Sequence, residues 1–190
     1  MLKDLILSNR SFRKFHEEYV INIDTLKELV NLARLSASSS NRQPLKYLLS
    51  CDAEKNAIIF PLMSSWKGRI AEWIGPEEGE RPSAYIIILG DTEISSSFSQ
   101  DPGIAAQSIL LGAVEKGLGG CMMASIKKEE AQKALNIPSQ YEILLTIALG
   151  KPNEAVIIET LETGEDSTYW VEEDYSHHVP KRRLEDIIIL

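Results

Sequence analysis

The sequence predicts one mixed α/β domain that continues into a long C-terminal arm. Its 190 residues are enough for one domain with a full hydrophobic core and few for two. Apolar residues recur with the period of a helix in one part of the chain and form a continuous β-branched run in another, so both kinds of element are expected. The chain shows no internal repeat and no low-complexity segment that would indicate a different architecture.

The first fifty residues contain two predicted helices and a strand. A short helix covers Leu2 to about Ser8. A second begins at Asp24, a favourable N-cap, and carries an apolar stripe at helical spacing, formed by Leu26, Leu29, Val30 and Ala33. A serine-rich loop ends this helix, and apolar residues within Lys46–Asp52 predict a strand.

The middle of the chain combines broken helical pieces with a buried strand. Helical pieces are predicted over Ala53–Trp73, interrupted near Pro61 because proline breaks a helix. The loop Gly75–Pro82 is rich in turn residues and is predicted to be exposed. The continuous run Ala84–Leu89 predicts a strand buried on both faces.

A largely apolar central helix is predicted after Asp101-Pro102, where the aspartate supplies the cap and the proline the first helical position. It covers Ile104–Lys116 and ends at Gly117–Gly120. A short strand, a surface helix and an apolar strand closed by Gly150-Lys151-Pro152 follow, over Cys121–Ala124, Lys128–Leu135 and Tyr141–Leu149. The remainder has little periodicity before Leu184, which predicts an irregular arm.

Composition and charge exclude several classes of function. A net charge of −8 argues against a general nucleic-acid surface, which needs a basic field. The chain shows no signal-peptide pattern and no apolar run near the ~20 residues of a membrane span, so neither secretion nor membrane insertion is expected. Cys51 and Cys121 lack CxxC spacing, which is typical of free thiols in a reducing cytoplasm.

Three polar segments are candidate binding motifs. Arg10, Ser11 and Arg13 bring two guanidinium groups and a hydroxyl together, which suits a phosphate or a ring carbonyl; the alternative is a solvated helix end. The segment Ser38–Asn41 follows a helix and could equally be a cap and turn. The basic cluster Lys181–Arg183 stands in an acidic tail, either as a second phosphate contact or as a solvated patch.

Other motifs do not support a different chemistry. Gly117–Gly120 follows a helix and does not join a strand to a helix, so no dinucleotide-binding loop is predicted. His16, His177 and His178 belong to no Cys/His cluster, and adjacent histidines on an extended segment point in opposite directions, so no metal site is predicted. No GxSxG elbow, P-loop or obvious carboxylate pair supports a hydrolase or a kinase.

Five segments resemble, in the same order, the motifs of the FMN-dependent nitroreductase family. They are Arg10–Phe15 for RRSxRxF, Ser38–Pro44 for PSxxNxQP, Asp101–Leu111 for the central-helix motif DxxxAxQNxLL, Gly117–Cys121 for GLGxC and Val179–Leu184 for the C-terminal basic motif. The resemblance covers nearly the whole chain. Asn9, Ala37 and Ser108 depart from it, because the family usually has arginine, proline and asparagine there.

The resemblance implies a nitroreductase-like α+β fold, with a central, mostly antiparallel sheet flanked by helices, in one domain over residues 1–190. It also implies a homodimer with FMN at the interface and a dimerisation arm, residues 151–190, that reaches the partner subunit. The resemblance implies ten cofactor contacts. One of them is Arg13, which would approach the pyrimidine side of the flavin ring. Phosphate and ribityl contacts come from Arg10, Ser11, Lys181 and Arg183, partner contacts from Ser38, Ser39 and Asn41, and a backbone approach to the ring from Met123 and Ala124.

The implied activity is reduction of a small-molecule electron acceptor, such as a nitroaromatic or a quinone, with NADH or NADPH as donor. Hydride would pass through flavin N5 in ping-pong turnover, and no catalytic side chain is assigned because the chemistry belongs to the cofactor. Other flavin chemistry (dehalogenation or flavin degradation), a non-catalytic FMN-binding or storage protein, and an acidic interaction domain remain alternatives. Phe60–Trp73, where relatives often place a substrate-gating element, carries no transferable family residue.

Overall fold

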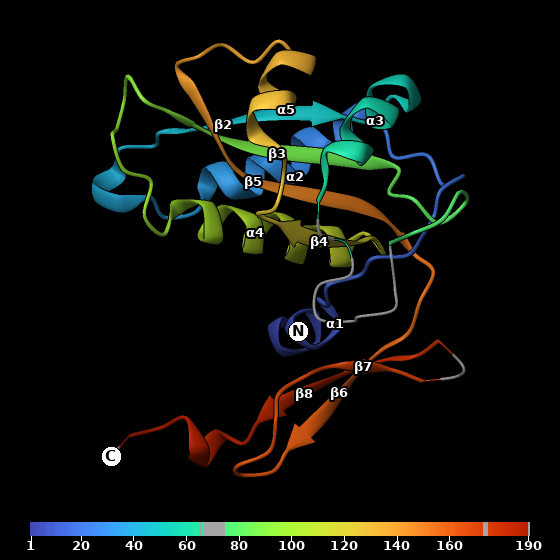
Figure 1. Ribbon diagram of the computed structural model, residues 1–190. Coiled ribbons are helices and arrows are strands. Elements are labelled where there is room, and N and C mark those ends of the chain that lie inside the picture. Colours follow the sequence, from blue (N-terminus) through green and yellow to red (C-terminus); the bar gives the residue numbers. More distant parts are fainter. Residues whose placement is uncertain (65, 67–74, 173–174, 190) are drawn as a thin grey trace.

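The computed structural model describes residues 1–64, 66, 75–172 and 175–189. At its centre three long strands, β2 (Leu45–Ser50), β3 (Ala84–Asp91) and β5 (Tyr141–Pro152), lie side by side in antiparallel order (Figure 1). Along its other edge β5 pairs, also antiparallel, with β4 (Gly119–Met123) and with the short β1 (Phe15–His16). The predicted α+β class and the mostly antiparallel sheet are therefore confirmed.

Strand β3 is buried along its whole length because its side chains supply two hydrophobic cores. Successive side chains of a strand point to opposite faces. Ile86 and Ile88 belong to the core on one face of the sheet, whereas Tyr85, Ile87 and Leu89 belong to the core on the other. This confirms the prediction of a strand buried on both sides.

Two pairs of helices cover the two faces of the sheet (Figure 1). On one face α2 (Ile23–Leu35) packs against α4 (Asp101–Glu115), with α1 (Leu2–Ser8) beside α4. On the other lie α3 (Ala53–Ile59), which continues into the 3-10 turn η2 (Phe60–Leu62), and α5 (Lys128–Ala134). The predicted stripe of α2 is confirmed, since Leu26, Leu29 and Ala33 are buried and Val30 packs against the same core.

Two helix starts differ from the prediction. Asn22, not Asp24, is the N-cap of α2, because its side chain accepts a hydrogen bond from the backbone N–H of Thr25 (2.8 Å). Asp101 is the first helical residue of α4 and Gln100 its N-cap, which places Pro102 one position later than predicted. The Asp101 carboxylate is occupied elsewhere, by the loop that follows α2.

Strand boundaries and loop exposure also needed correction. Only Gly117, at φ +71°, ends the central helix, because Gly119 and Gly120 already belong to β4. Strand β5 continues to Pro152, past its predicted end. In the loop 75–82, Pro76 and Pro82 are buried, so the predicted exposure is correct only in part; the predicted helical pieces up to Trp73 lie partly outside the described residues.

The prediction of an irregular C-terminal arm was wrong. Residues after 155 form a second sheet, in which β8 (His177–Arg182) runs parallel to β6 (Val156–Leu161) and antiparallel to β7 (Trp170–Val171). This small sheet lies beside α1 and ends in the 3-10 turn η3 (Leu184–Asp186) (Figure 1). Its strands are short and partly exposed, so they carry no clear alternation in the sequence.

None of the helices in the described part of the chain combines the length and the apolar character needed to cross a bilayer.

Candidate functional site

A basic hollow of about 310 Å³ lies where the segment after α1 meets α4, β4 and the C-terminal sheet. Its lining includes four residues predicted to form the site, Arg10, Ser11, Arg13 and Lys181, although the last is about 170 positions from the others. The remaining lining residues are Asn9, Gln107, Leu110, Met122, Val156, Tyr169, His177 and Val179. The fold therefore brings both ends of the chain to one place.

The hollow is suited to an anion. Arg10, Arg13 and Lys181 are cationic, and no acidic side chain is among the described residues that line it. Arg10 donates through one terminal nitrogen to the carbonyl of Ile6 (2.6 Å), while its buried Nε has no partner in the described part of the chain. Buried donors are nearly always paired in folded proteins, so this orphan Nε indicates that a ligand oxygen belongs there.

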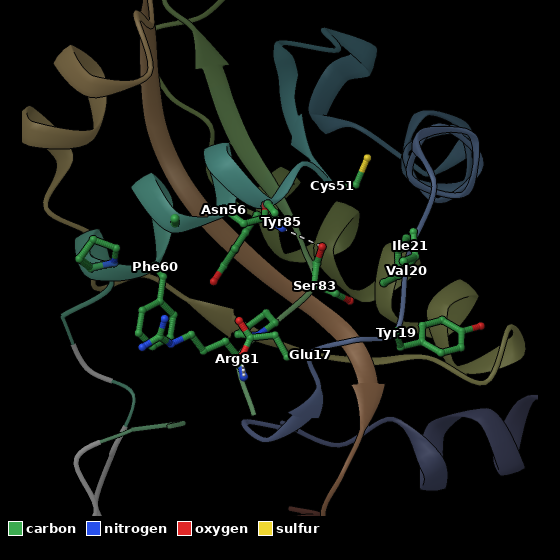
Figure 2. Close-up of a pocket in the computed structure, with 14 residues that line it drawn as sticks. Glu17, Tyr19, Val20, Ile21, Cys51, Asn56, Phe60, Arg81, Ser83 and Tyr85 are labelled. Atoms are coloured by element: carbon green, nitrogen blue, oxygen red, sulfur yellow. Dashed lines mark hydrogen bonds between the residues drawn. The ribbon is translucent and has the colours of Figure 1, made fainter. Parts of the chain in front are cut away.

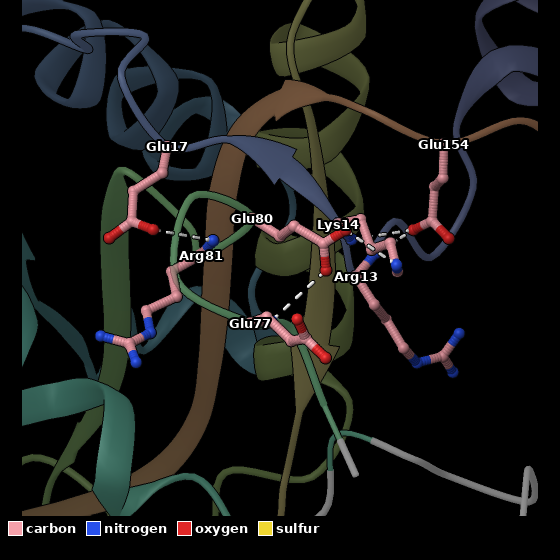
Figure 3. A network of polar contacts seen from close by, with 7 residues as sticks. All are labelled: Arg13, Lys14, Glu17, Glu77, Glu80, Arg81 and Glu154. Carbon is pink, nitrogen blue, oxygen red and sulfur yellow. Dashed lines mark hydrogen bonds and ion pairs between the residues drawn. The ribbon is translucent and has the colours of Figure 1, made fainter. Parts of the chain in front are cut away.

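Arg13 is held in place through its backbone. The Glu154 carboxylate accepts hydrogen bonds from the backbone N–H groups of Arg13 and of Lys14, the latter at 3.0 Å (Figure 3). Burial raises the pKa of Glu154, and these two bonds oppose that rise. Lys14 also pairs with Glu80 (2.8 Å), which ties the segment to the loop 77–81. The Arg13 guanidinium is thereby left to face the hollow, 5.3 Å from the centre of the Tyr169 ring.

The paired histidines of β8 point to opposite faces, as predicted. His178 contacts Glu159 (2.7 Å) and stacks on Trp170. His177 faces the basic hollow, is 3% exposed and lies edge-on to Tyr169 at 5.0 Å. Burial lowers the pKa of His177 to about 4, with help from Arg13 and His178, so its imidazole is neutral at neutral pH. Among the described residues, no three His, Cys, Asp or Glu side chains gather as a metal ion would require.

The serine-rich loop lies elsewhere in the same chain. Ser38 lines a separate hollow of about 140 Å³, donates to Asp101 Oδ2 (2.5 Å) and accepts from the backbone N–H of Gln43 (2.9 Å). The backbone N–H of Ser39 donates to Asp101 Oδ1 (2.9 Å). Three non-glycine residues here have left-handed backbones, with φ of +51° to +52°, namely Ser40, Asn41 and Gln43. Such strain is common at ligand-binding loops.

Three further predicted contacts lie outside the basic hollow. Met123 is buried in the core and Ala124 follows it on the exposed surface, while Met122, on the opposite face of β4, lines the hollow. Arg183 forms ion pairs with Glu162 (2.7 Å) and Glu185 (2.9 Å) within the arm, although its buried Nε makes no aligned hydrogen bond in the described part of the chain.

Sequence reasoning missed four residues that shape this site. Glu154 positions Arg13, and Gln107, Tyr169 and His177 line the hollow. Gln107 stands in the family-like motif of the central helix, and His177 was weighed only as a metal ligand, a role that the sequence did not support. Glu154 and Tyr169 lie in segments without periodicity, so no local pattern marks them.

The depressed pKa of His177 predicts a specific pH dependence of stability. Between about pH 6.5 and pH 4 the unfolded chain binds a proton at this residue and the native protein does not, so the free energy of unfolding falls as pH decreases. The slope from this one group is at most about 1.4 kcal/mol per pH unit. His177→Gln removes it, so the variant's stability should depend less steeply on pH across that window. Denaturant unfolding at several pH values measures the difference, and parallel curves would contradict the assignment.

Comparisons with known proteins show which proteins the chain is similar to. A model described as the nitroreductase family matches residues 6–74 and 81–151. The chain is 25% identical over 168 residues to the iodotyrosine deiodinase of Thermotoga neapolitana, covering 81% of this chain and 90% of that protein. It is 25% identical over 170 residues to the NADPH-flavin oxidoreductase of Vibrio harveyi, covering 80% and 65%. The crystal structure of a nitroreductase family protein from Clostridium novyi NT has the same fold, with a TM-score of 0.66 at 21% identity over 95% of this chain and 94% of that chain.

Proposed function

Because the chain belongs to the nitroreductase family, we propose that it is an FMN-dependent oxidoreductase that takes electrons from NADH or NADPH and passes them to a small acceptor, such as a nitroaromatic or a quinone. The observation that carries this proposal is the basic hollow. Three cationic side chains line it, the buried Nε of one of them has no partner in the described part of the chain, and no acidic side chain is among its described lining residues.

The residues present fit FMN. Arg10, Ser11 and Lys181 would hold the phosphate and the ribityl chain, because a buried guanidinium donor, a hydroxyl and an exposed ammonium converge there. Arg13 would face the pyrimidine side of the ring, where a fixed positive charge favours the added electrons. When bound, FMN supplies the hydride chemistry.

A homodimer completes the proposed site. Ser38, Ser39 and Asn41 do not line the basic hollow of their own chain, so we infer that they contact the cofactor held by the partner subunit. Asp101 would keep this loop in its strained conformation through its bonds to Ser38 and Ser39. We also propose that the backbone at the C-terminal end of β4, at Met123 and the following Ala124, lies next to the flavin ring.

Size-exclusion chromatography with light scattering and absorbance detection tests the proposal in one experiment. The purified protein should be yellow, release FMN and not FAD on denaturation, and elute with about twice the chain mass of 21.3 kDa and one flavin per chain. NADH or NADPH should bleach the flavin, and an added nitroaromatic should restore it and sustain turnover. A colourless monomer that does not take up added FMN would overturn the proposal, while bleaching without turnover would indicate a storage protein.

Reductive dehalogenation is the second candidate. It is favoured by the similarity to a protein named iodotyrosine deiodinase, which extends over 90% of that protein's length. Release of halide from a halogenated aromatic by the reduced protein, at a rate exceeding reduction of a nitroaromatic, would favour this activity over the first.

A further inference from the structure

A second and larger cavity, the Tyr85 cavity, has a volume of about 520 Å³ and shares no lining residue with the basic hollow. It lies between the segment that follows β1, the helix α3 and the start of β3 (Figure 2). One wall is largely apolar and includes Val20, Ile21 and Ala57, beside Tyr19 with its phenol ring. Cavities of this size that combine apolar walls with a few polar groups are typical of small-molecule sites.

Three polar atoms in this cavity have no partner. Arg81, Ser83 and Tyr85 all line this cavity, the first two just before β3 and the third within it. Arg81 Nε, Ser83 Oγ and the Tyr85 hydroxyl are all buried and make no hydrogen bond within the described part of the chain. Tyr85 itself is 0% exposed. Since buried polar atoms are nearly always paired, three unpaired atoms on residues that line one cavity indicate a missing partner.

Two other polar groups of the cavity, Asn56 and Glu17, already have hydrogen-bond partners. Asn56 donates to the carbonyl of Ser83 (2.8 Å) and accepts from Ser50 Oγ (2.7 Å). Glu17 accepts hydrogen bonds from the backbone N–H group of Gly79 (2.6 Å) and from that of Arg81 (3.3 Å), the second of which is drawn in Figure 3. The unpaired buried atoms of the site, Arg81 Nε, Ser83 Oγ and the Tyr85 hydroxyl, can each donate a hydrogen bond.

Arg81 and Tyr85 are hydrogen-bond donors, and stacking holds the Arg81 guanidinium in place. A guanidinium can only donate, and burial followed by the nearby Glu17 raises the pKa of Tyr85, which keeps its phenol protonated. The Arg81 guanidinium lies 4.7 Å from the centre of the Phe60 ring, and Phe60 stacks in turn on Trp66 at 5.5 Å. This stacking orients the planar fork of Arg81, which matches the two oxygens of a carboxylate.

We propose that the Tyr85 cavity binds a small apolar monocarboxylate, with the carboxylate on Arg81, Ser83 and Tyr85 and the apolar body against Ile21 and Ala57. The negative charge of Glu17 in the same lining disfavours a dianion such as a phosphate ester. This site is separate from the basic hollow and does not depend on the proposed flavin chemistry.

Fluorine NMR with 4-fluorophenylacetate as the probe tests the proposal on the full chain saturated with FMN. Saturable binding is expected below about 1 mM, and the neutral 4-fluorophenylacetamide and the dianionic 4-fluorobenzylphosphonate should bind at least about tenfold more weakly. Arg81→Gln should weaken binding of the carboxylate about tenfold or more, and Tyr85→Phe about threefold. Lys133→Gln, which removes one positive charge on α5 outside the cavity, is the matched control and should leave binding unchanged.

Two further measurements keep the result free of folding artefacts. Tyr85→Phe breaks no hydrogen bond, so its thermal midpoint should not fall below that of the unmodified protein. Cys51 lines the cavity and Cys121 is buried elsewhere, so saturating probe should slow alkylation of Cys51 by iodoacetamide several-fold, with Cys121 as internal reference. The proposal would be overturned by no saturable binding up to about 10 mM, by equal affinity for the amide, by full affinity in Arg81→Gln, or by an unchanged Cys51 rate.

Discussion

Replacing Arg10 and Lys181 together by glutamine is expected to weaken FMN binding about a hundredfold or more and to leave riboflavin binding nearly unchanged. Both side chains line the basic hollow, and the buried Nε of Arg10 has no partner among the described residues. Charge-assisted hydrogen bonds to phosphate contribute about 1.5–3 kcal/mol each, so the loss of two amounts to about 3 kcal/mol or more. Riboflavin lacks the phosphate and would not register the change.

Flavin fluorescence titration with both ligands measures this effect. Arg183→Gln is the matched control, because Arg183 is paired with Glu162 and Glu185 in the arm and does not line the hollow. Its affinity for FMN should stay within about twofold of the unmodified protein. Equal weakening of FMN and riboflavin in the double variant would indicate a collapsed hollow, and a large effect of Arg183→Gln would place the phosphate on that side chain.

Gly120→Ala is expected to destabilise the protein by about 3 kcal/mol and to abolish FMN binding. A Cβ at this position of β4 would lie 2.5 Å from the carbonyl oxygen of Ala148 and 2.7 Å from Leu110 Cδ2. The first contact is with backbone of the neighbouring strand β5, so no rotamer change relieves it. The Gly120 carbonyl also accepts the backbone N–H of Phe12 (3.1 Å), so a displaced β4 would move Ser11 out of the basic hollow.

Denaturant unfolding and flavin titration of the same variant test both parts. Gly103→Ala offers a matched control, since the residue is inside α4 and, outside its own helix backbone, the described residues place no atom within 4 Å of an added Cβ there. That variant should be about 0.5 kcal/mol more stable, because alanine favours the helix over glycine. A Gly120→Ala protein with normal stability, or one that is unstable yet binds FMN normally, would contradict the proposed link between the packing of β4 and the site.

Local patterns in the sequence determined the main elements of this protein. The run Ala84–Leu89 predicted a doubly buried strand, because a strand covered on both faces carries continuous apolar residues with no polar alternation. The spacing of Leu26, Leu29 and Ala33 predicted the buried face of α2, and the ends of α1 agree with the prediction. Residue type made Arg10, Ser11 and Arg13 candidates for an anion site, with a solvated helix end as the alternative, and in the structure they share one hollow. These features could be predicted from the sequence because each pattern depends only on residues that are close to one another along the chain.

Contacts between distant residues were decided by the tertiary structure alone. Glu154 accepts a hydrogen bond from the backbone of Arg13, which is 141 positions away in the sequence. The second sheet places Lys181 at the basic hollow, whereas Arg183 pairs with Glu162 within the arm. The Tyr85 cavity likewise depends on segments around Glu17, α3 and β3 that meet only in the folded chain. No local periodicity encodes which carboxylate reaches which backbone or which face a short, half-exposed strand presents. Those choices follow from strand pairing and core packing, which act between residues remote in sequence.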